Sequence, residues 1–157
     1  MGNTTGNPMP KMIFWRKLEE GWLKINFDAA TDSKNQKVGV GVIIRDHNGE
    51  QMAACSEPNL LLPQPLIAEA AAMRKAIELC IELGFNRVII EGDAKVILEA
   101  VVNPNTCWTA YGQIIQDVKE SLKELNDWKI IFVRRKRNEV AHILAKMAVS
   151  RGNAMLG

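Results

Sequence analysis

The segment Trp22–Asp28 has the residue pattern of a β-strand with one buried face. Its apolar positions are Leu23, Ile25 and Phe27, and polar residues occupy the positions between them. This period of two is typical of a strand. The alternation ends on the carboxylate of Asp28, which two small residues follow. Small neighbours would let a metal ion or a polynucleotide approach, but Asp also ends strands because it begins turns well.

Composition and charge limit the class of protein. The 157 residues suit one domain, and 47% of them are hydrophobic, enough for an ordinary core. The net charge of +2 excludes a histone-like chain but not a local basic patch. The three cysteines are unpatterned, which favours a reducing compartment, the nucleus or the cytoplasm. No apolar run is long enough to cross a membrane. We expect a lead-in over residues 1–20, a domain over 21–151 and a tail over 152–157.

The rest of the chain predicts further strands and helices in the order βββαβααβα. Asp46-His47-Asn48-Gly49 predicts a hairpin turn, and Gly39 and Gly41 indicate a bulge or a close backbone approach. The predicted strands cover 22–29, 38–45, 50–56, 87–91 and 128–133, and the predicted helices 66–83, 93–101, 109–125 and 138–149. This order indicates a layered α/β fold.

Apolar spacing predicts which face of each long helix is buried. For the first helix, begun by Pro65 and ended by Gly84, the expected buried residues are Met73, Ala76, Ile77, Cys80 and Leu83. For the last helix they are Val140, Ile143, Leu144 and Met147.

Three acids occupy places where an open α/β sheet exposes functional groups. Asp28 ends a predicted strand, Glu69 lies in a predicted first helical turn, and Asp93 follows another strand at a helix start. Three converging carboxylates would suit Mg²⁺ or Mn²⁺, which prefer oxygen ligands, and not zinc. Each acid also has an ordinary explanation, since carboxylates at helix N-termini are stabilised by the helix dipole.

Four motifs resemble the ribonuclease H family, most closely its plant reverse-transcriptase-like branch, whose members often derive from retroelements. The motifs are Lys24-Ile-Asn-Phe-Asp-Ala-Ala, Ala68-Glu-Ala-Ala-Ala-Met, Glu91-Gly-Asp-Ala and Asn138-Glu-Val-Ala-His-Ile-Leu-Ala. The resemblance implies a three-layer fold with a five-stranded mixed sheet flanked by helices. It also implies hydrolysis of the RNA strand of an RNA–DNA hybrid by a monomer that needs no small-molecule cofactor. Asp28 would then bridge two Mg²⁺ or Mn²⁺ ions, with Glu69 on one and Asp93 on the other.

The last motif departs from the family pattern, because His142 stands where a fourth acid is usual. We expect this side chain to be at least partly exposed. Either it ligates a metal, favouring Mn²⁺ over Mg²⁺, or it is a surface residue and the fourth ligand is lost. Both alternatives predict weaker activity and weaker retention of the second ion.

A basic run, Arg134-Arg135-Lys136-Arg137, precedes Asn138. Many relatives carry a histidine in the loop before the last helix, and Arg135 is the closest match to it. We expect this run and Asn138 to bind nucleic acid, although it also fits a nuclear localisation signal or a solvated loop.

Two other functions compete with the hybrid nuclease. One is a catalytically impaired relative that binds nucleic acid or protein, which His142 favours. The other is a different nuclease of the same fold. Proofreading-type exonucleases have an acid at the position of Ala30 in this chain, and integrases have Glu at the position of His142.

Overall fold

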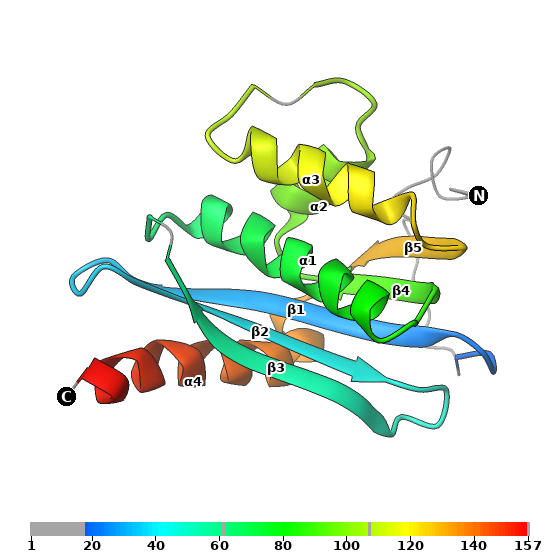
Figure 1. Cartoon of the computed structure of the whole chain (residues 1–157), viewed down its shortest axis with the longest axis horizontal. Helices are drawn as coiled ribbons and strands as arrows, with labels where there is room; N and C mark the ends of the chain where they lie inside the picture. Colours follow the sequence, from blue (N-terminus) through cyan, green and yellow to red (C-terminus); the bar gives the residue numbers. More distant parts are fainter. Residues whose placement is uncertain (1–17, 61, 107, 157) are drawn as a thin grey trace.

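The computed structural model describes residues 18–60, 62–106 and 108–156, with only the backbone for 152–156. One five-stranded sheet lies between two helical layers, with strand order β3-β2-β1-β4-β5 (Figure 1). The strands are β1 (Leu23–Asp32), β2 (Lys37–Arg45), β3 (Gln51–Asn59), β4 (Arg87–Gly92) and β5 (Asp127–Phe132). β1, β2 and β3 form an antiparallel meander, whereas β4 and β5 run parallel to β1. The predicted mixed α/β sheet is therefore confirmed.

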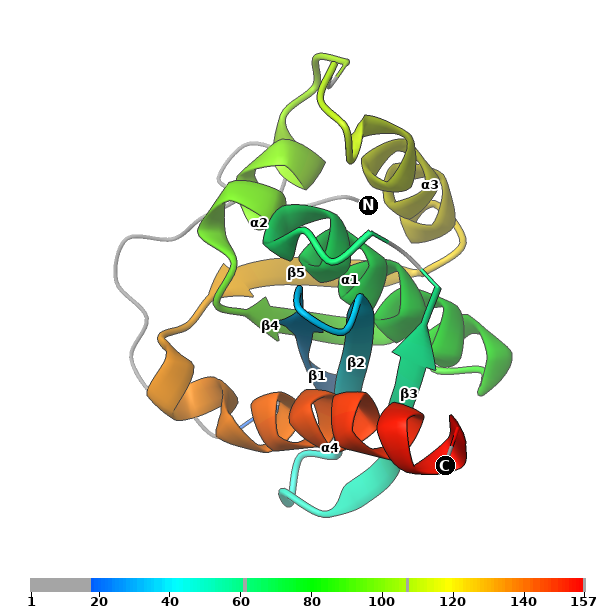
Figure 2. The same cartoon turned by 90° about the vertical axis from the view of Figure 1, so that its left-hand side faces the viewer.

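The helices divide between the two faces of the sheet (Figure 2). They are α1 (Pro65–Glu82), α2 (Lys95–Val102), α3 (Gly112–Leu122) and α4 (Glu139–Leu156), with the 3-10 turn η1 (Arg135–Asn138) just before α4. The first three helices cover one face and α4 covers the other. No helix in the described part of the chain is long and apolar enough to span a membrane.

Two glycine turns form as predicted. Gly49, with φ of +80°, closes the β2–β3 hairpin, in which the Asp46 carboxylate accepts backbone hydrogen bonds from Asn48 and Glu50. Gly84, with φ of +77°, ends α1. The amides of Gly84 and Phe85 donate there to carbonyls of the last helical turn. Both positions need a left-handed backbone, which glycine adopts without strain.

The boundaries around the acids differ from prediction. β1 does not end near Asp28, because its pairing with β2 continues to Asp32. The pairing of β1 with β4 stops at Asn26, however, so Asp28 lies just beyond the part of β1 that β4 covers. α1 begins at Pro65, which places Glu69 in the second helical turn and not the first. Asp93 lies between β4 and α2.

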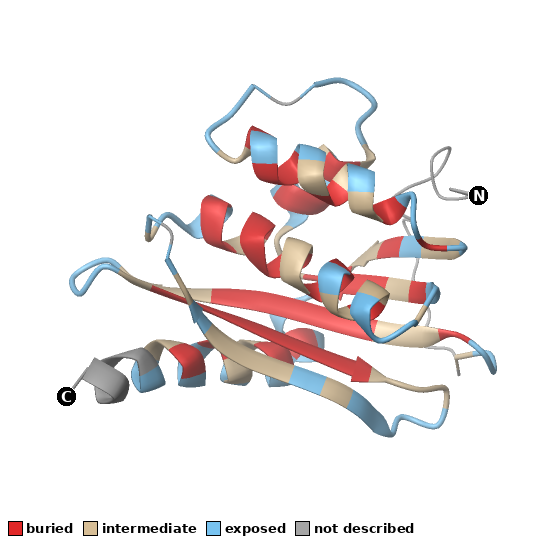
Figure 3. Cartoon of the chain, in the orientation of Figure 1, coloured by how far each residue is buried: buried red, intermediate tan, exposed pale blue. Residues whose placement is uncertain are grey.

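The predicted inward face of α4 is wrong. Val140, Ile143 and Met147 are exposed, and Leu144 is half-buried. The residues of α4 that are fully buried are Ala141, Ala145 and Ala148. Figure 3 shows the exposed outer side of this helix. In α1, Leu83 is likewise exposed, since the helix ends there.

The glycines of β2 explain this orientation of α4. An added Cβ at Gly39 would lie 2.8 Å from the Ala148 Cβ, and one at Gly41 would lie 2.8 Å from the Leu144 Cβ. Such contacts are closer than atoms tolerate, so the helix backbone rests directly on the two glycines. The predicted close backbone approach is confirmed, and the fully buried residues of α4 beside it are alanines.

Candidate active site

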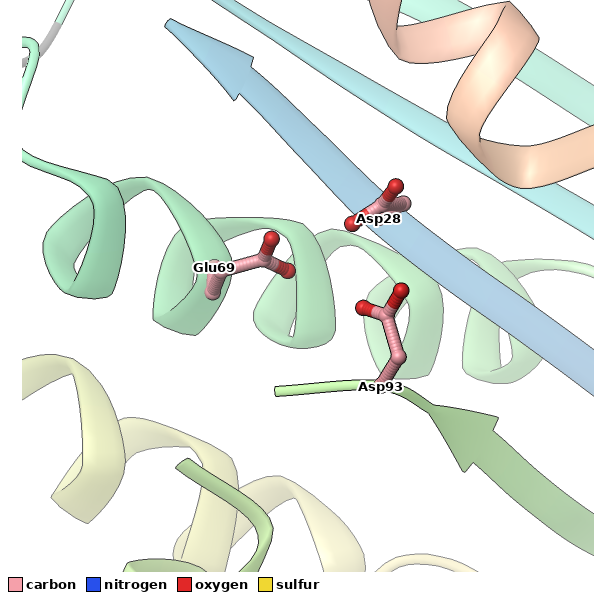
Figure 4. Close-up of side chains that lie close together, drawn as sticks. All are labelled: Asp28, Glu69 and Asp93. Carbon is pink, nitrogen blue, oxygen red and sulfur yellow. The ribbon is translucent and has the colours of Figure 1, made fainter. Parts of the chain in front are cut away.

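Three carboxylates from three different elements meet at one edge of the sheet. Asp28 comes from β1, Glu69 from α1, and Asp93 from the segment after β4. One oxygen of each lies within 4.8 Å of the others. Figure 4 shows the side chains pointing toward one another. The structure therefore brings together the three acids that the sequence singled out.

The fold places these acids in a largely buried position. The Asp28 side chain has no exposed surface, and that of Asp93 is only 9% exposed. Asp28 lies opposite Gly41 in the β1–β2 ladder. Because α4 rests on Gly41, the first turns of that helix come close to Asp28. The close packing of α4 on β2 thus brings the helix to the acids.

Electrostatics in this cluster are unfavourable without a cation. Burial raises the pKa of Glu69 to about 10, and the neighbouring carboxylates of Asp28 and Asp93 add to the shift. No hydrogen-bond donor among the described residues reaches Asp28 Oδ1 or Glu69 Oε1, although both atoms are buried. Buried carboxylate oxygens without donors are costly. The set therefore fits a hard divalent cation, for which the two oxygens without donors would serve as ligands.

Arg135 and His142 close the other side of the cluster. His142 Nδ1 lies 2.8 Å from Asp28 Oδ2, and Arg135 Nε donates to Asp93 Oδ2 at 2.6 Å. The Arg135 guanidinium also lies 3.8 Å from Asp28 Oδ2 and 2.9 Å from the His142 ring. Its hydrogen bond to Asp93 raises the pKa of Arg135, which stays charged.

His142 is 27% exposed, so the expected partial exposure is confirmed. The group whose ligand atoms all lie within 4.8 Å of one another contains Asp28, Glu69 and Asp93 but not His142. The structure thus places His142 against the Asp28 carboxylate, at the margin of the acid cluster.

The model of the reverse transcriptase-like family matches residues 26–148, most of the chain. This range includes all three acids and His142. The chain belongs to this family. No curated protein sequence matches it.

Solved structures show that this reverse transcriptase-like domain has the fold of type 1 ribonuclease H. Ribonuclease H1 of the archaeon Halobacterium salinarum is 22% identical with a TM-score of 0.76, and the match covers 83% of this chain and 98% of that one. The N-terminal ribonuclease H domain of a Mycobacterium tuberculosis protein is 14% identical with a TM-score of 0.77, covering 87% and 99%. LC11-RNase H1, solved in complex with an RNA/DNA hybrid, is 18% identical with a TM-score of 0.73, covering 83% and 98%.

The predicted nucleic-acid-binding residues divide into two groups in this reverse transcriptase-like domain. Arg134, Lys136 and Arg137 are exposed, like Arg135. Asn138 is only 1% exposed, and its amide Nδ2 donates to the Phe27 carbonyl at 2.8 Å. Because its amide is bonded inside the domain, Asn138 is not part of the exposed surface that the four basic residues form.

Sequence reasoning missed two buried polar residues beside the acids. Asn26 and Glu91 are 3% and 5% exposed, and Asn26 Nδ2 donates to Glu91 Oε1 at 3.0 Å. Asn26 occupies a polar position of the strand alternation, and Glu91 ends the apolar run of β4. Only the parallel register, which pairs Asn26 with Glu91, shows that these two residues meet.

Proposed function

We propose that this domain is a metal-dependent endonuclease that hydrolyses the RNA strand of RNA–DNA hybrids. The observation that carries the proposal is the cluster of Asp28, Glu69 and Asp93, whose oxygens lie within 4.8 Å of one another and include buried atoms without donors. Membership in the reverse transcriptase-like family and the ribonuclease H fold support it.

In this proposal Asp28, Glu69 and Asp93 would hold Mg²⁺ or Mn²⁺. Bound ions would activate the attacking water and stabilise the leaving oxygen. The chain's own residues shape the site: burial of Asp28 excludes bulk water from one side, and the half-exposed guanidinium of Arg135 stands at the rim. That guanidinium would contact a phosphate of the substrate, and the exposed side chains of Arg134, Lys136 and Arg137 would contact neighbouring phosphates.

His142 offers a ring nitrogen beside Asp28, and this nitrogen as a metal ligand would weaken the site toward Mg²⁺. Imidazole suits Mn²⁺ better than Mg²⁺, and it adds no negative charge. We therefore propose modest activity with a preference for Mn²⁺, and weak retention of a second ion.

A second candidate is a catalytically impaired domain that binds nucleic acid without cutting it. The contacts of Arg135 with Asp28 and Asp93 favour it, since they already supply positive charge to the acids. In such a domain the protein's own cation would replace the metal, and the basic run would still bind phosphates.

Cleavage of a labelled RNA–DNA hybrid, in Mg²⁺ and separately in Mn²⁺, tests the two candidates. Duplex RNA, duplex DNA and single strands are assayed in parallel. Asp28→Asn should abolish cutting, whereas Asp32→Asn, the same change further along β1, should not. Absence of cutting in both metals by a folded sample would overturn the nuclease proposal. Hybrid binding that depends on the basic run would then support the second candidate.

A further inference from the structure

A buried polar network lies next to the acids and has no part in the chemistry proposed above. It consists of Asn26 on β1, Glu91 on β4 and Asn138 at the end of η1, each no more than 5% exposed. Asn26 Nδ2 donates to Glu91 Oε1 at 3.0 Å and to Asn138 Oδ1 at 3.1 Å. Asn138 Nδ2 donates in turn to the Phe27 carbonyl at 2.8 Å. We call these three residues the Asn26 network.

The network joins segments that are distant in the sequence. Asn26 and Glu91 are 65 residues apart, and Asn26 and Asn138 are 112 apart. Each member stands close to a residue of the site: Asn26 is two positions from Asp28, Glu91 is two from Asp93, and Asn138 is three from Arg135. Lys24 Nζ lies 3.7 Å from the second Glu91 oxygen, so the buried carboxylate is also charge-paired.

Buried polar groups of this kind fix one geometry rather than add much stability. Apolar side chains of similar size would pack here at less cost, but they would not define the direction in which η1 leaves the sheet. Asn138 has donor and acceptor groups bonded to two successive residues of β1, Asn26 and Phe27. This double attachment links the turn that carries Arg135 to β1 at two points.

We infer that Asn138 and Asn26 are positioning residues, which attach η1 to β1 and thereby place Arg135 on Asp93 and His142 on Asp28. For the kinetic consequence, the inference rests on the proposed hydrolysis. Arg135 and His142 act on the cluster, and the Asn26 network acts only through them. Loss of residues that orient the groups of a metal site typically costs about 10–100-fold in activity.

The first test needs no activity. In the ¹⁵N-labelled full chain, the Arg135 Nε–H should be protected from exchange by its hydrogen bond to Asp93. Asn138→Ala should remove this protection. Leu122→Ala, a core change in α3 remote from the site, should leave it intact. Thermal unfolding tests whether each variant is folded. If Asn138→Ala does not fold, Asn26→Ala removes the same anchor from the β1 side. An unprotected Nε–H in the wild type, or protection unchanged in the variants, would overturn the inference.

The second test is a kinetic cycle on the hybrid. Asn138→Ala should lower kcat about ten-fold with KM little changed, and Leu122→Ala should not. In a background in which Arg135 and His142 are both alanine, Asn138→Ala should lower kcat less than about two-fold. If Asn138→Ala lowered kcat by the same factor in both backgrounds, the inference would be overturned. Wild-type protein that cuts no hybrid would overturn the proposed function instead, and the exchange experiment would still decide the role of Asn138.

Discussion

At the scale of single residues, the raised pKa of Glu69 has a consequence for stability. Glu69 keeps its proton in the metal-free folded protein up to a pKa of about 10, whereas the unfolded chain releases it near the ordinary value of 4.5. The unfolded state therefore binds fewer protons between these values, and the folded state loses stability as pH rises through this window. Glu69→Gln removes the titration.

We therefore expect Glu69→Gln to stabilise the metal-free protein at pH 8 by about 0.5–2 kcal/mol while abolishing hydrolysis. Urea unfolding in a chelator at pH 5 and pH 8 measures the effect. The advantage of the variant should be larger at pH 8, and Mg²⁺ or Mn²⁺ should stabilise the wild type more than the variant. An equal difference at the two pH values would contradict this account.

His142 allows a gain of function to be predicted. Its ring lies 2.8 Å from the Asp28 carboxylate, so an acid at this position would join the cluster. His142→Asp supplies an oxygen ligand and a negative charge, and we expect about ten-fold higher activity in Mg²⁺ with a smaller change in Mn²⁺. Steady-state cleavage rates in the two metals measure it. His47→Asp, in the distant hairpin turn, is the matched control. Lower activity in both metals would count against His142 as the cause of the weak use of Mg²⁺ proposed above.

The acids were predictable because each belongs to a local motif, but their surroundings were not. Asp28, Glu69 and Asp93 each lie in a short motif that resembles the ribonuclease H family, although only Asp93 lies between a strand and a helix as the sequence predicted. The contact between Arg135 and Asp93 spans 42 residues and depends on how η1 leaves β5. The burial of Asn138 could not be predicted for the same reason, since next to four basic residues it resembles part of a charged loop. Only the fold shows that its amide turns inward.

At the scale of elements, the packing of α4 on β2 should be intolerant of added volume. A Cβ at Gly41 would lie 2.8 Å from the Leu144 Cβ and closer still to the helix backbone. Gly41→Ala must therefore push α4 outward, at a cost of about 1–3 kcal/mol in the free energy of unfolding. Met147→Gln, on the exposed side of α4, should change it by no more than about 0.5 kcal/mol.

Chemical denaturation measures the free energy of unfolding of both variants. The displacement of α4 should also separate His142 from Asp28, so Gly41→Ala should lose activity beyond its loss of stability. If Met147→Gln lowered the free energy of unfolding more than Gly41→Ala, the result would show that the exposed apolar residues of α4 belong to the core after all.

The same packing explains why the sequence mispredicted α4. Periodicity locates apolar stripes, and α4 has two of them: a small stripe of alanines and a large stripe containing Ile143 and Met147. Burial usually follows size, which favours the large stripe. Here the glycines of β2 decide otherwise, because without side chains they let the helix backbone approach with the alanines, and not Ile143 or Met147, buried against the sheet. The information was present in β2 and not in α4.

At the scale of the whole molecule, the order of strands and helices was enough to predict the fold class. The hairpin turn at Asp46–Gly49 and the apolar run of β4 separate an antiparallel meander from parallel strands, and a helix must connect the two. The order of strands across the sheet and the side on which each helix packs follow from long-range contacts. Here the resemblance to a known family supplied what local patterns do not.

Charge is distributed unevenly over the domain, and this predicts how hybrid binding responds to salt. The net charge is only +2, but Arg134, Lys136 and Arg137 are exposed together beside the acid cluster. Each phosphate contact that is lost should reduce the slope of log affinity against log salt concentration by about 0.7–0.9. Replacing all three residues by serine should therefore make this negative slope shallower by about 2–3 and weaken binding most at low salt.

Binding of a labelled hybrid at several salt concentrations measures this slope, with Asp28→Asn present throughout to prevent cutting. Lys123→Ser, at the exposed end of α3, removes a positive charge away from the site and should leave the slope unchanged. A slope that falls by the same amount per charge removed in both variants would show that binding follows the overall charge of the domain. A slope that falls only with the basic run places the phosphate backbone next to Asp28, Glu69 and Asp93, as hydrolysis requires.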